Sequence, residues 1–514
     1  MSGRYLLAID AGTGSCRAVL FDESGGQVAV GQREWTHHEP PGVPGGQDFD
    51  VSAGWIAISA CVRDALHAAG ARGRDVAAVS ATSMREGVVL YDRAGHEIWA
   101  CPNVDSRAAD EAAGLVRDGS ADKIYAEAGD WVSITSPARL RWLARHQPGI
   151  LGATASMGML SDWILYRLSG NHVTEPSCGS SSGMFRLADR VWSHDITALC
   201  GLTAAALPPV VDPGTVVGQV TAEAAALTGL SEGTPVVAGG ADTQLGLLGA
   251  GTRENEYTAV AGTFWQNTVL LPEPLIDPEV RLRTLCHVLP GAWMLEGIGF
   301  YCGMAMRWFR DAFCDAESGL ARGRGVDPYI VMEEAAAKAP AGGVVAILSN
   351  VMNARRWVHA SPSFLGLDLG DPVSARGACV RAIEEAAAYV TRAHRDIITS
   401  LTGLEFGEMV FTGGAAKGQL WPRIMADVLG VPVHVPAVTE SSALGAAICA
   451  GVGAGTYASL LEPRDSLRQH AATYEPDPAG DHDEHYDAWR ELYQRMLGIT
   501  EDGLLRPLWR AAGT

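Results

Sequence analysis

The chain has 514 residues, too many for a single hydrophobic core, so we expect at least two domains. Its net charge of −20, from 59 acidic and 39 basic residues, argues against a general nucleic-acid-binding protein and against binding to an anionic membrane surface. A hydrophobic content of 47% together with 60 glycines indicates a globular α/β protein that is rich in turns.

The cysteines and the apolar segments indicate the cellular compartment in which the protein is expected. The ten cysteines are scattered and form no C-x-x-C pair, which predicts reduced, mostly buried thiols. Asp10 interrupts the one apolar stretch near the N-terminus that could resemble a signal peptide, and no run of about 18 apolar residues occurs elsewhere. We therefore expect a soluble, cytoplasmic protein without a membrane span.

A β-meander opens the chain. Residues 5–10, 16–21 and 27–35 predict three strands that Gly-rich turns connect. Asp10 ends the first strand, and the turn Ala11-Gly12-Thr13-Gly14-Ser15 follows. Glycine lets a backbone approach phosphate groups, and a carboxylate beside it can face a metal ion. An ordinary hairpin would use glycine in the same way, so both interpretations stay open at this point.

The rest of the first half alternates between helices and short strands. The pattern predicts a helix over residues 50–70, a strand over 76–80, a return to the same sheet at 88–91, a mostly helical segment over 105–170, and a strand over 234–240.

Charged residues follow the ends of these strands. Arg85 and Glu86 could hold vicinal hydroxyl groups with a donor and an acceptor, or could form a surface ion pair. Asp105-Ser106-Arg107 could line the same substrate side. Asp242 ends a strand and starts a small-residue helix, so it could accept a proton from a substrate hydroxyl during phosphoryl transfer, or could cap that helix.

The second half repeats the order of the first. Ala11-Gly12-Thr13 recurs as Ala261-Gly262-Thr263, again between two apolar segments. A strand, an acidic residue and a small-residue helix occur around Asp242 and again around Glu440. These repeats predict two similar halves with a boundary near residues 251–256 and a cleft between them. Two matched glycine turns could hold a nucleotide from both sides of that cleft.

The remaining second-half elements are predicted as follows. Residues 272–340 have an irregular, Gly/Pro-punctuated pattern and predict an insertion, whereas 374–400 predict a long core helix with a small-residue stripe. A strand over 408–412 opens onto the Gly-rich loop 413–418, which suits an adenosine but is also typical of a simple βα loop. The acidic tail has one amphipathic helix near 484–497, and His482-Asp483-Glu484-His485 is interpreted as a helix start and not as a metal site.

Two common nucleotide motifs are absent. The segment from Gly12 to Arg17 lacks the third glycine of a dinucleotide fingerprint and precedes a strand, and no G-x-x-x-x-G-K-[ST] sequence occurs.

Over residues 5–455 the chain resembles the FGGY carbohydrate kinases. The resemblance is carried by DAGTGSCRAVLFD at 10–22, SMREGVVLYD at 83–92, GGADTQLG at 239–246, GTFWQ at 262–266, RAIEEAAAYV at 381–390, and FTGGAAKGQLWPRIMADVLGVPV with ESSALGAA at 411–447. It implies an α/β fold with two actin-like ATPase (ribonuclease-H-like) domains and an interdomain active-site cleft. The domains would be 1–252, with the substrate site and catalytic base, and 253–455, with the nucleotide site, followed by a C-terminal helical tail over 456–514.

The resemblance also implies roles for single residues. Asp242 would be the catalytic base and would lie in the substrate site with Arg85 and Glu86. Asp10, through water, and Asp242 would hold Mg²⁺, and ATP would be the phosphoryl donor. The nucleotide-binding residues would be Gly12, Thr13, Gly262, Thr263, Gly413, Gly414, Ala415 and Lys417. Two positions depart from the family pattern, since Lys417 replaces a frequent Asn and Arg139 replaces a usual Lys.

Within the family, the segments at 83–109, 261–266, 306–314, 413–418 and 445–455 resemble kinases of a quorum-sensing signal. Their acceptor would be linear 4,5-dihydroxy-2,3-pentanedione, phosphorylated on its C5 hydroxyl. A pentulose such as xylulose or ribulose, or glycerol, is the alternative acceptor, and an actin-like ATPase without a sugar substrate is the alternative class. The phosphocarrier protein HPr is a further implied partner, nucleic acid is not, and either a monomer or a homodimer is expected.

Overall fold

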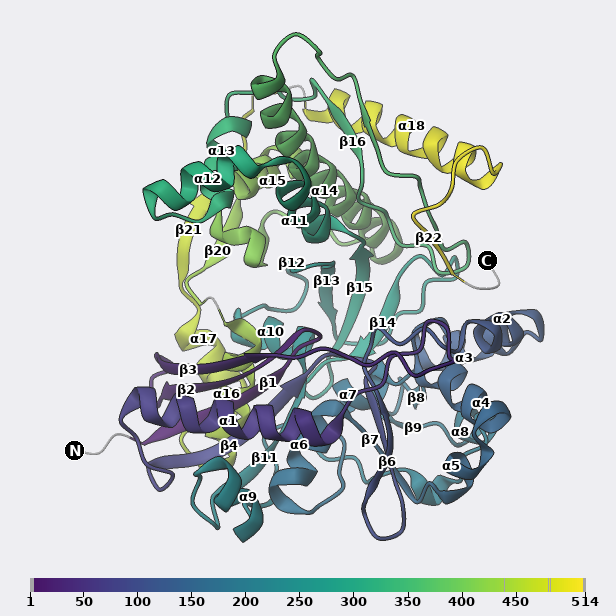
Figure 1. Ribbon diagram of the computed structural model, residues 1–514, viewed down its shortest axis with the longest axis vertical. Helices are drawn as coiled ribbons and strands as arrows, with labels where there is room; N and C mark the ends of the chain where they lie inside the picture. The colour runs from purple at the N-terminus through teal and green to yellow at the C-terminus, as the bar shows by residue number, and fades with distance from the viewer. Residues whose placement is uncertain (1–3, 439, 479, 481, 512–514) are drawn as a thin grey trace.

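The computed structural model describes residues 4–438, 440–478, 480 and 482–511. It contains two large mixed sheets, one in each half of the chain (Figure 1). The N-terminal sheet has the order β10-β11-β4-β1-β2-β3. Its strands are β1 (Tyr5–Ala11), β2 (Ser15–Asp22), β3 (Gln27–Glu34), β4 (Val76–Ser83), β10 (Val216–Gln219) and β11 (Pro235–Ala241).

The C-terminal sheet has the order β14-β15-β13-β12-β19-β20-β21. Its strands are β12 (Tyr257–Ala261), β13 (Trp265–Leu271), β14 (Arg283–Cys286), β15 (Trp293–Gly299), β19 (Met409–Gly413), β20 (Val433–Pro436) and β21 (His470–Tyr474).

Four neighbouring strands in each sheet share one topology. In the first sheet β1 is antiparallel to β2 and parallel to β4, and β4 is parallel to β11. In the second sheet β12 is antiparallel to β13 and parallel to β19, and β19 is parallel to β20. The predicted internal repeat and the α/β class are therefore confirmed.

Alternating residues of β1 are buried on opposite faces of the sheet, because strand side chains alternate. Leu7 and Ile9 join a core that contains α1 (Val51–Ala69) and α6 (Leu160–Ser169). Leu6 and Ala8 join another core on the opposite face, which contains residues of α16 (Ser441–Gly453). A helix of the second half thus covers the sheet of the first half (Figure 1).

Helix α10 (Asp242–Gly249) makes the reciprocal contact. Its Leu247 packs against Leu270, Leu285 and Met294 of the C-terminal sheet. α10 and α16 approach closely through glycine, because a Cβ atom on Gly249 or on Gly445 would overlap a carbonyl group of the other helix. The Ser442 hydroxyl also donates to the Asp242 carbonyl at 2.9 Å. Asp242, at the start of α10, therefore lies between the two sheets.

Helices also cover the outer face of the C-terminal sheet. They are α11 (Cys302–Phe313), α12 (Asp315–Arg324), α13 (Pro328–Ala336), α14 (Pro372–Thr402), α15 (Leu420–Leu429) and α18 (His482–Glu501). The small-residue stripe of α14 is buried as predicted, with Ala382, Ala386 and Ala387 in the core. The C-terminal tail contains α17 (Leu461–Leu467) and α18, and it contributes strand β21 to the edge of the C-terminal sheet. Residues 479, 481 and 512–514 of the tail lie outside the described residues.

Two predictions about strands are wrong. Residues 272–340 are not an irregular insertion, because they form β14, β15 and three helices. Some of the glycines that suggested a loop lie in short turns, such as Gly291, where φ is +67°, and others lie within the strands and helices, such as Gly297 in β15. The strand at 88–91, β5 (Val88–Tyr91), does not rejoin the first sheet but pairs with β6 (Glu97–Cys101) and β7 (Ser156–Met159). Glu86 adopts a left-handed φ of +61° and redirects the chain there.

The other elements are short. They are α2 (Ala109–Arg117), α3 (Ser120–Ala128), α4 (Ser136–His146), α5 (Pro148–Ala153), α7 (Pro176–Ser181), α8 (His194–Leu199), α9 (Ala222–Thr228), β8 (Phe185–Arg186), β9 (Val191–Trp192), β16 (Val345–Ile347), β17 (Val358–His359), β18 (Ser363–Leu365) and β22 (Trp509–Arg510). All ten cysteines are buried free thiols, as predicted. Among the described residues, no helix has both the length and the apolar character that a membrane crossing requires.

Candidate active site

The candidate carboxylates gather where parallel strands end. In the sheet register Asp10 of β1 lies beside Thr82 of β4, and Thr82 lies beside Gly240 of β11. Adjacent strands are about 4.8 Å apart, so Asp10 and Gly240 are roughly 10 Å apart, and Asp242 follows two residues later. The register therefore brings Asp10 and Asp242 to the same edge of the sheet, as the motifs predicted.

Both carboxyl groups have raised pKa values. Burial raises the pKa of Asp10 to about 7, with Arg17 opposing the shift and the negative charges of Asp242 and Glu440 adding to it. Burial raises the pKa of Asp242 to about 6, with Arg85 opposing the shift and Glu86 adding to it. The negative charge of Asp242 is among the causes that raise the pKa of Asp10, which indicates that the two carboxylates lie close enough to share a cation or a phosphorylated ligand.

Asp242 does not serve as the helix N-cap, since Ala241 occupies that position. Its Oδ1 atom accepts hydrogen bonds from the backbone N–H of Thr243 at 2.7 Å and from the Thr243 hydroxyl at 3.3 Å. Its Oδ2 atom has no hydrogen-bond partner within the part of the chain that the structure describes. One carboxylate oxygen is therefore fixed while the other is available to a ligand.

Side chains from other parts of the first half form hydrogen bonds with the Gly12-Thr13 turn. The Trp35 indole donates to the Gly12 carbonyl at 3.0 Å, and the His37 Nε2 atom lies 2.7 Å from the Thr13 carbonyl. The Thr13 hydroxyl donates to Asn103 at 3.1 Å. The sequence did not predict these three supporting residues, because no motif around Trp35, His37 or Asn103 indicates a contact with the Gly12-Thr13 turn.

The second glycine turn lies next to the predicted adenosine loop. Ala261 pairs with Gly413 in the sheet register, so Gly262-Thr263 and Gly413-Gly414-Ala415 emerge side by side from β12 and β19. Gly413 has a φ of +97°, and a Cβ atom there would lie 2.6 Å from the Ala261 carbonyl oxygen. Lys417 is exposed and has no hydrogen bond or ion pair to another described residue.

Gly303, which was not predicted, supports the same turn. A Cβ atom on Gly303 would overlap the Gly262 carbonyl, and the next residue, Met304, donates its N–H to the Thr263 carbonyl at 3.2 Å. The first turn of α11 is thereby packed directly against Gly262-Thr263.

Arg85 and Glu86 are buried, so the surface ion-pair interpretation is wrong. Arg85 donates to both carboxylate oxygens of Glu296, at 3.0 and 2.9 Å, and its Nε atom lies 4.0 Å from Glu86. Glu86 in turn accepts from Arg283 at 2.7 Å, and Arg283 also pairs with Asp130. The result is a buried cluster of five charged residues beside Asp242.

The partners Arg283, Glu296 and Asp130 were missed. Glu296 interrupts the apolar strand Trp293–Gly299, and a carboxylate in a buried strand requires a paired charge. That pattern is the one signal that could have identified it.

Arg139 supports the same region through the backbone. Its guanidinium donates to the carbonyl of Glu86 and, at 3.0 Å each, to those of Asn103 and Asp105. Asp105 and Arg107 form a buried ion pair with each other at 2.7 Å. Asp105 and Arg107 are therefore paired with each other, beside the carbonyl groups that Arg139 binds.

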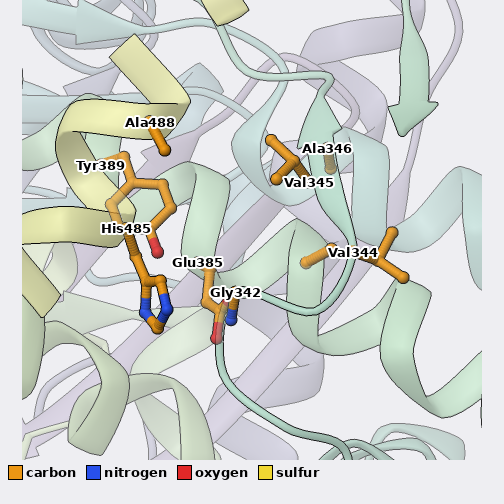
Figure 2. A pocket seen from close by; sticks show the side chains of 9 residues that line it. Gly342, Val344, Val345, Ala346, Glu385, Tyr389, His485 and Ala488 are labelled. Carbon is orange, nitrogen blue, oxygen red and sulfur yellow. The ribbon is translucent and has the colours of Figure 1, made fainter. Parts of the chain in front are cut away.

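Two other places are not strong candidates. A cavity between β16, α14 and α18 encloses only about 30 Å³, and its lining includes Glu385, Tyr389 and His485 (Figure 2). That volume suits a water molecule or two and no larger ligand. His482-Asp483-Glu484-His485 starts α18 as predicted, and no group of three or more His, Cys, Asp or Glu side chains among the described residues is arranged to hold a metal ion.

Comparison with known proteins agrees with this arrangement. Sequence profiles of the N-terminal and C-terminal domains of the FGGY family of carbohydrate kinases match residues 5–249 and 258–454. A protein named autoinducer-2 kinase from Yersinia enterocolitica is 44% identical, covering 100% of this chain and 98% of the relative. A protein of the same name from Escherichia coli O139:H28 is also 44% identical, covering 99% and 98%.

Solved structures show the same fold. The xylulose kinase from Rhodospirillum rubrum superposes with a TM-score of 0.83 at 29% identity, covering 97% of this chain and 100% of that one. The Plasmodium falciparum glycerol kinase superposes with a TM-score of 0.81 at 19% identity, covering 96% and 98%. The expected fold of two actin-like, ribonuclease-H-like halves is thus confirmed, and the chain belongs to the FGGY family of carbohydrate kinases, which transfer a phosphoryl group from ATP to a hydroxyl group.

Proposed function

We propose that this protein is an autoinducer-2 kinase, which phosphorylates linear 4,5-dihydroxy-2,3-pentanedione on its C5 hydroxyl with ATP. The full-length relatives that bear this name support the choice of acceptor. The proposed reaction would retain the phosphorylated signal in the cytoplasm, since a charged phosphate ester crosses a membrane poorly.

One juxtaposition carries the proposal: Asp242, with an unpaired Oδ2 atom, lies beside the buried Arg85-Glu86 pair. A guanidinium donates to an acceptor oxygen and a carboxylate accepts from a hydroxyl group, so the pair suits a molecule with adjacent oxygens. Asp242 would take the proton of the C5 hydroxyl as that oxygen attacks the γ-phosphate. With a pKa of about 6, its carboxylate is mostly ionised at neutral pH.

The nucleotide would lie along the strand ends of both halves. Gly12-Thr13 and Gly262-Thr263 would donate to the phosphates, because glycine lets the backbone N–H groups come close. Gly413, Gly414 and Ala415 would support the adenosine, with Lys417 at the loop end. The proposed division of labour is residues 1–252 for the acceptor and base, 253–455 for the nucleotide, and 456–514 as a tail.

Mg²⁺ would suit Asp10 and Asp242. This ion prefers oxygen ligands and commonly uses one or two carboxylates together with phosphates and water, so no larger protein ligand set is needed. Burial is the main cause of both raised pKa values, and nearby carboxylates add to each of them; such a concentration of buried negative charge fits a cation site. When bound, Mg²⁺ would neutralise charge on the phosphates.

Xylulose, ribulose or glycerol is the alternative acceptor within the family. Regulation by HPr and the choice between a monomer and a homodimer stay predictions. The family membership removes the ATPase without an acceptor from consideration.

The test is ADP release measured with the pentanedione, xylulose, ribulose, glycerol and no acceptor. We expect the highest kcat/KM with the pentanedione, and NMR of the product should place the phosphate on C5. Asp242→Asn should lower kcat by at least roughly 1000-fold while ATP still binds, because the general base is lost. A higher kcat/KM for a pentulose or glycerol would contradict the acceptor, and retained turnover in Asp242→Asn would contradict the base.

A further inference from the structure

One face of the C-terminal sheet reaches the Arg85-Glu86 pair from the other half of the chain. On this face Leu285 and Met294 pack against Leu247 of α10. Glu296 lies two residues beyond Met294 on β15, so its side chain is on the same face. Arg283 is the residue directly opposite Glu296 on β14.

The hydrogen bonds and ion pairs that Glu296 and Arg283 form with Arg85 and Glu86 each join opposite charges. Glu296 is fully buried and accepts from Arg85 at 3.0 and 2.9 Å, while its second cation, Arg283, is 3.8 Å away. Arg283 reaches Glu86 at 2.7 Å. Arg85 and Glu86, the residues proposed to bind the phosphoryl acceptor, are therefore each bound by a residue of the second half.

We propose that Glu296 is a positioning residue for the phosphoryl acceptor, which fixes the Arg85 guanidinium from the opposite half of the enzyme. The inference rests on the proposed role of Arg85 in acceptor binding. Both carboxylate oxygens of Glu296 accept from one guanidinium nitrogen, Nη1, so Glu296 holds that end of the Arg85 side chain in place through a charge-assisted contact. Without Glu296, Arg85 could turn toward Glu86 or Asp242, both of which attract it.

This geometry also makes binding of the phosphoryl acceptor depend on how the two halves of the protein are positioned relative to each other. Arg85 follows β4 of the first sheet, and Glu296 belongs to β15 of the second. The Arg85 guanidinium has its proposed orientation only when β15 is in place. A purely structural role, in which Glu296 only neutralises a buried arginine, is the alternative that the experiment must exclude.

The first variant is Glu296→Gln, which keeps the shape of the side chain and one acceptor oxygen but removes its charge. We expect the KM for the acceptor to rise roughly tenfold, since a small displacement of an orienting group weakens productive binding, while the KM for ATP stays unchanged. The acceptor is whichever compound the wild type phosphorylates best. Glu256→Gln is the matched control, because it removes a buried carboxylate that accepts from Arg468 at 3.0 Å outside the acceptor site; it should change neither KM.

A double-mutant cycle separates positioning from structure. In an Arg85→Met background, Glu296→Gln should change the acceptor kcat/KM by less than about twofold, because its effect acts through Arg85. An equal fold-change in both backgrounds, or an equal rise in the KM of ATP, would overturn the proposal. Should Glu296→Gln fold poorly, Glu296→Asp retains the charge and should raise the acceptor KM with unchanged ATP KM; no rise would overturn it.

The two proposals fail differently. An unchanged acceptor KM in Arg85→Met alone would overturn the acceptor role of Arg85. A raised acceptor KM in Arg85→Met together with an unchanged one in Glu296→Gln would overturn only the role of Glu296.

Discussion

At the scale of single residues, Gly413 links backbone conformation to the proposed nucleotide site. Its φ of +97° is a conformation that residues with a side chain rarely adopt, and a Cβ atom would lie 2.6 Å from the Ala261 carbonyl oxygen. Gly407, two residues before β19 and outside the proposed nucleotide site, has no positive φ and no atom within 4 Å of an added Cβ. Gly413 and Gly407 therefore provide a matched pair for substitution.

We expect Gly413→Ala to raise the KM for ATP at least roughly tenfold, because the substitution must push the loop away from Gly262-Thr263. The KM for the acceptor should change little, since Arg85 and Glu86 belong to the other half. Gly407→Ala is the control, and its KM for ATP should remain within about twofold of the wild type. Steady-state kinetics with each substrate varied in turn measures both values; equal effects of the two substitutions would contradict the strain argument.

At the scale of elements, local patterns predicted what lies within one strand or turn but not what packs across the fold. Asp10, the Gly12-Thr13 turn and its repeat at Gly262-Thr263 were identified because a strand end and a glycine turn are contiguous in sequence. Glu296 was missed, since its partner Arg85 is 211 residues away and only tertiary packing joins them. β14 and β15 pair with each other, and they were taken for an irregular segment because glycine and proline residues punctuate this part of the chain.

Helix α6 provides a test of burial at a helix start. The Asp162 carboxylate accepts from the Met159 N–H at 2.9 Å, and burial raises its pKa to about 8 despite that hydrogen bond. In the unfolded chain the Asp162 carboxyl has its ordinary pKa of 3.8, so the folded protein holds a proton that the unfolded chain releases. The stability contributed by this proton is complete below about pH 4 and is lost as the pH rises to about 8.

Asp162→Asn cannot ionise, so its unfolding temperature relative to the wild type should increase between pH 5 and pH 8, by about 2 to 4 °C. Asp50→Asn is the control, because Asp50 is an exposed N-cap of α1. Its difference from the wild type should be the same at both pH values. Thermal unfolding followed by circular dichroism measures both variants, and a difference for Asp162→Asn that does not depend on pH would refute the burial argument.

At the scale of the whole molecule, the two halves exchange helices. α16 of the second half covers Leu6, Ala8, Val19 and Phe21 of the first sheet, and α10 of the first half covers Leu270, Leu285 and Met294 of the second. The sequence repeat predicted two similar halves, and it gave no indication of this exchange, because each helix follows its own strand in the usual order. The halves are separable in sequence but share buried surface.

A fragment of residues 1–252 should therefore fail to fold alone, although it contains a whole sheet. Without α16 one face of that sheet exposes Leu6, Val19 and Phe21, and leaving each large apolar side chain in water costs about 1.5 to 3 kcal/mol. Expression of 1–252 together with 253–514 as separate chains should restore a soluble complex, since α16 is then supplied in trans. Solubility and a cooperative thermal transition by circular dichroism distinguish these outcomes. A soluble, cooperatively melting 1–252 fragment would show that the exchanged helix is dispensable for the first half and that the proposed boundary near 252 separates independent folding units.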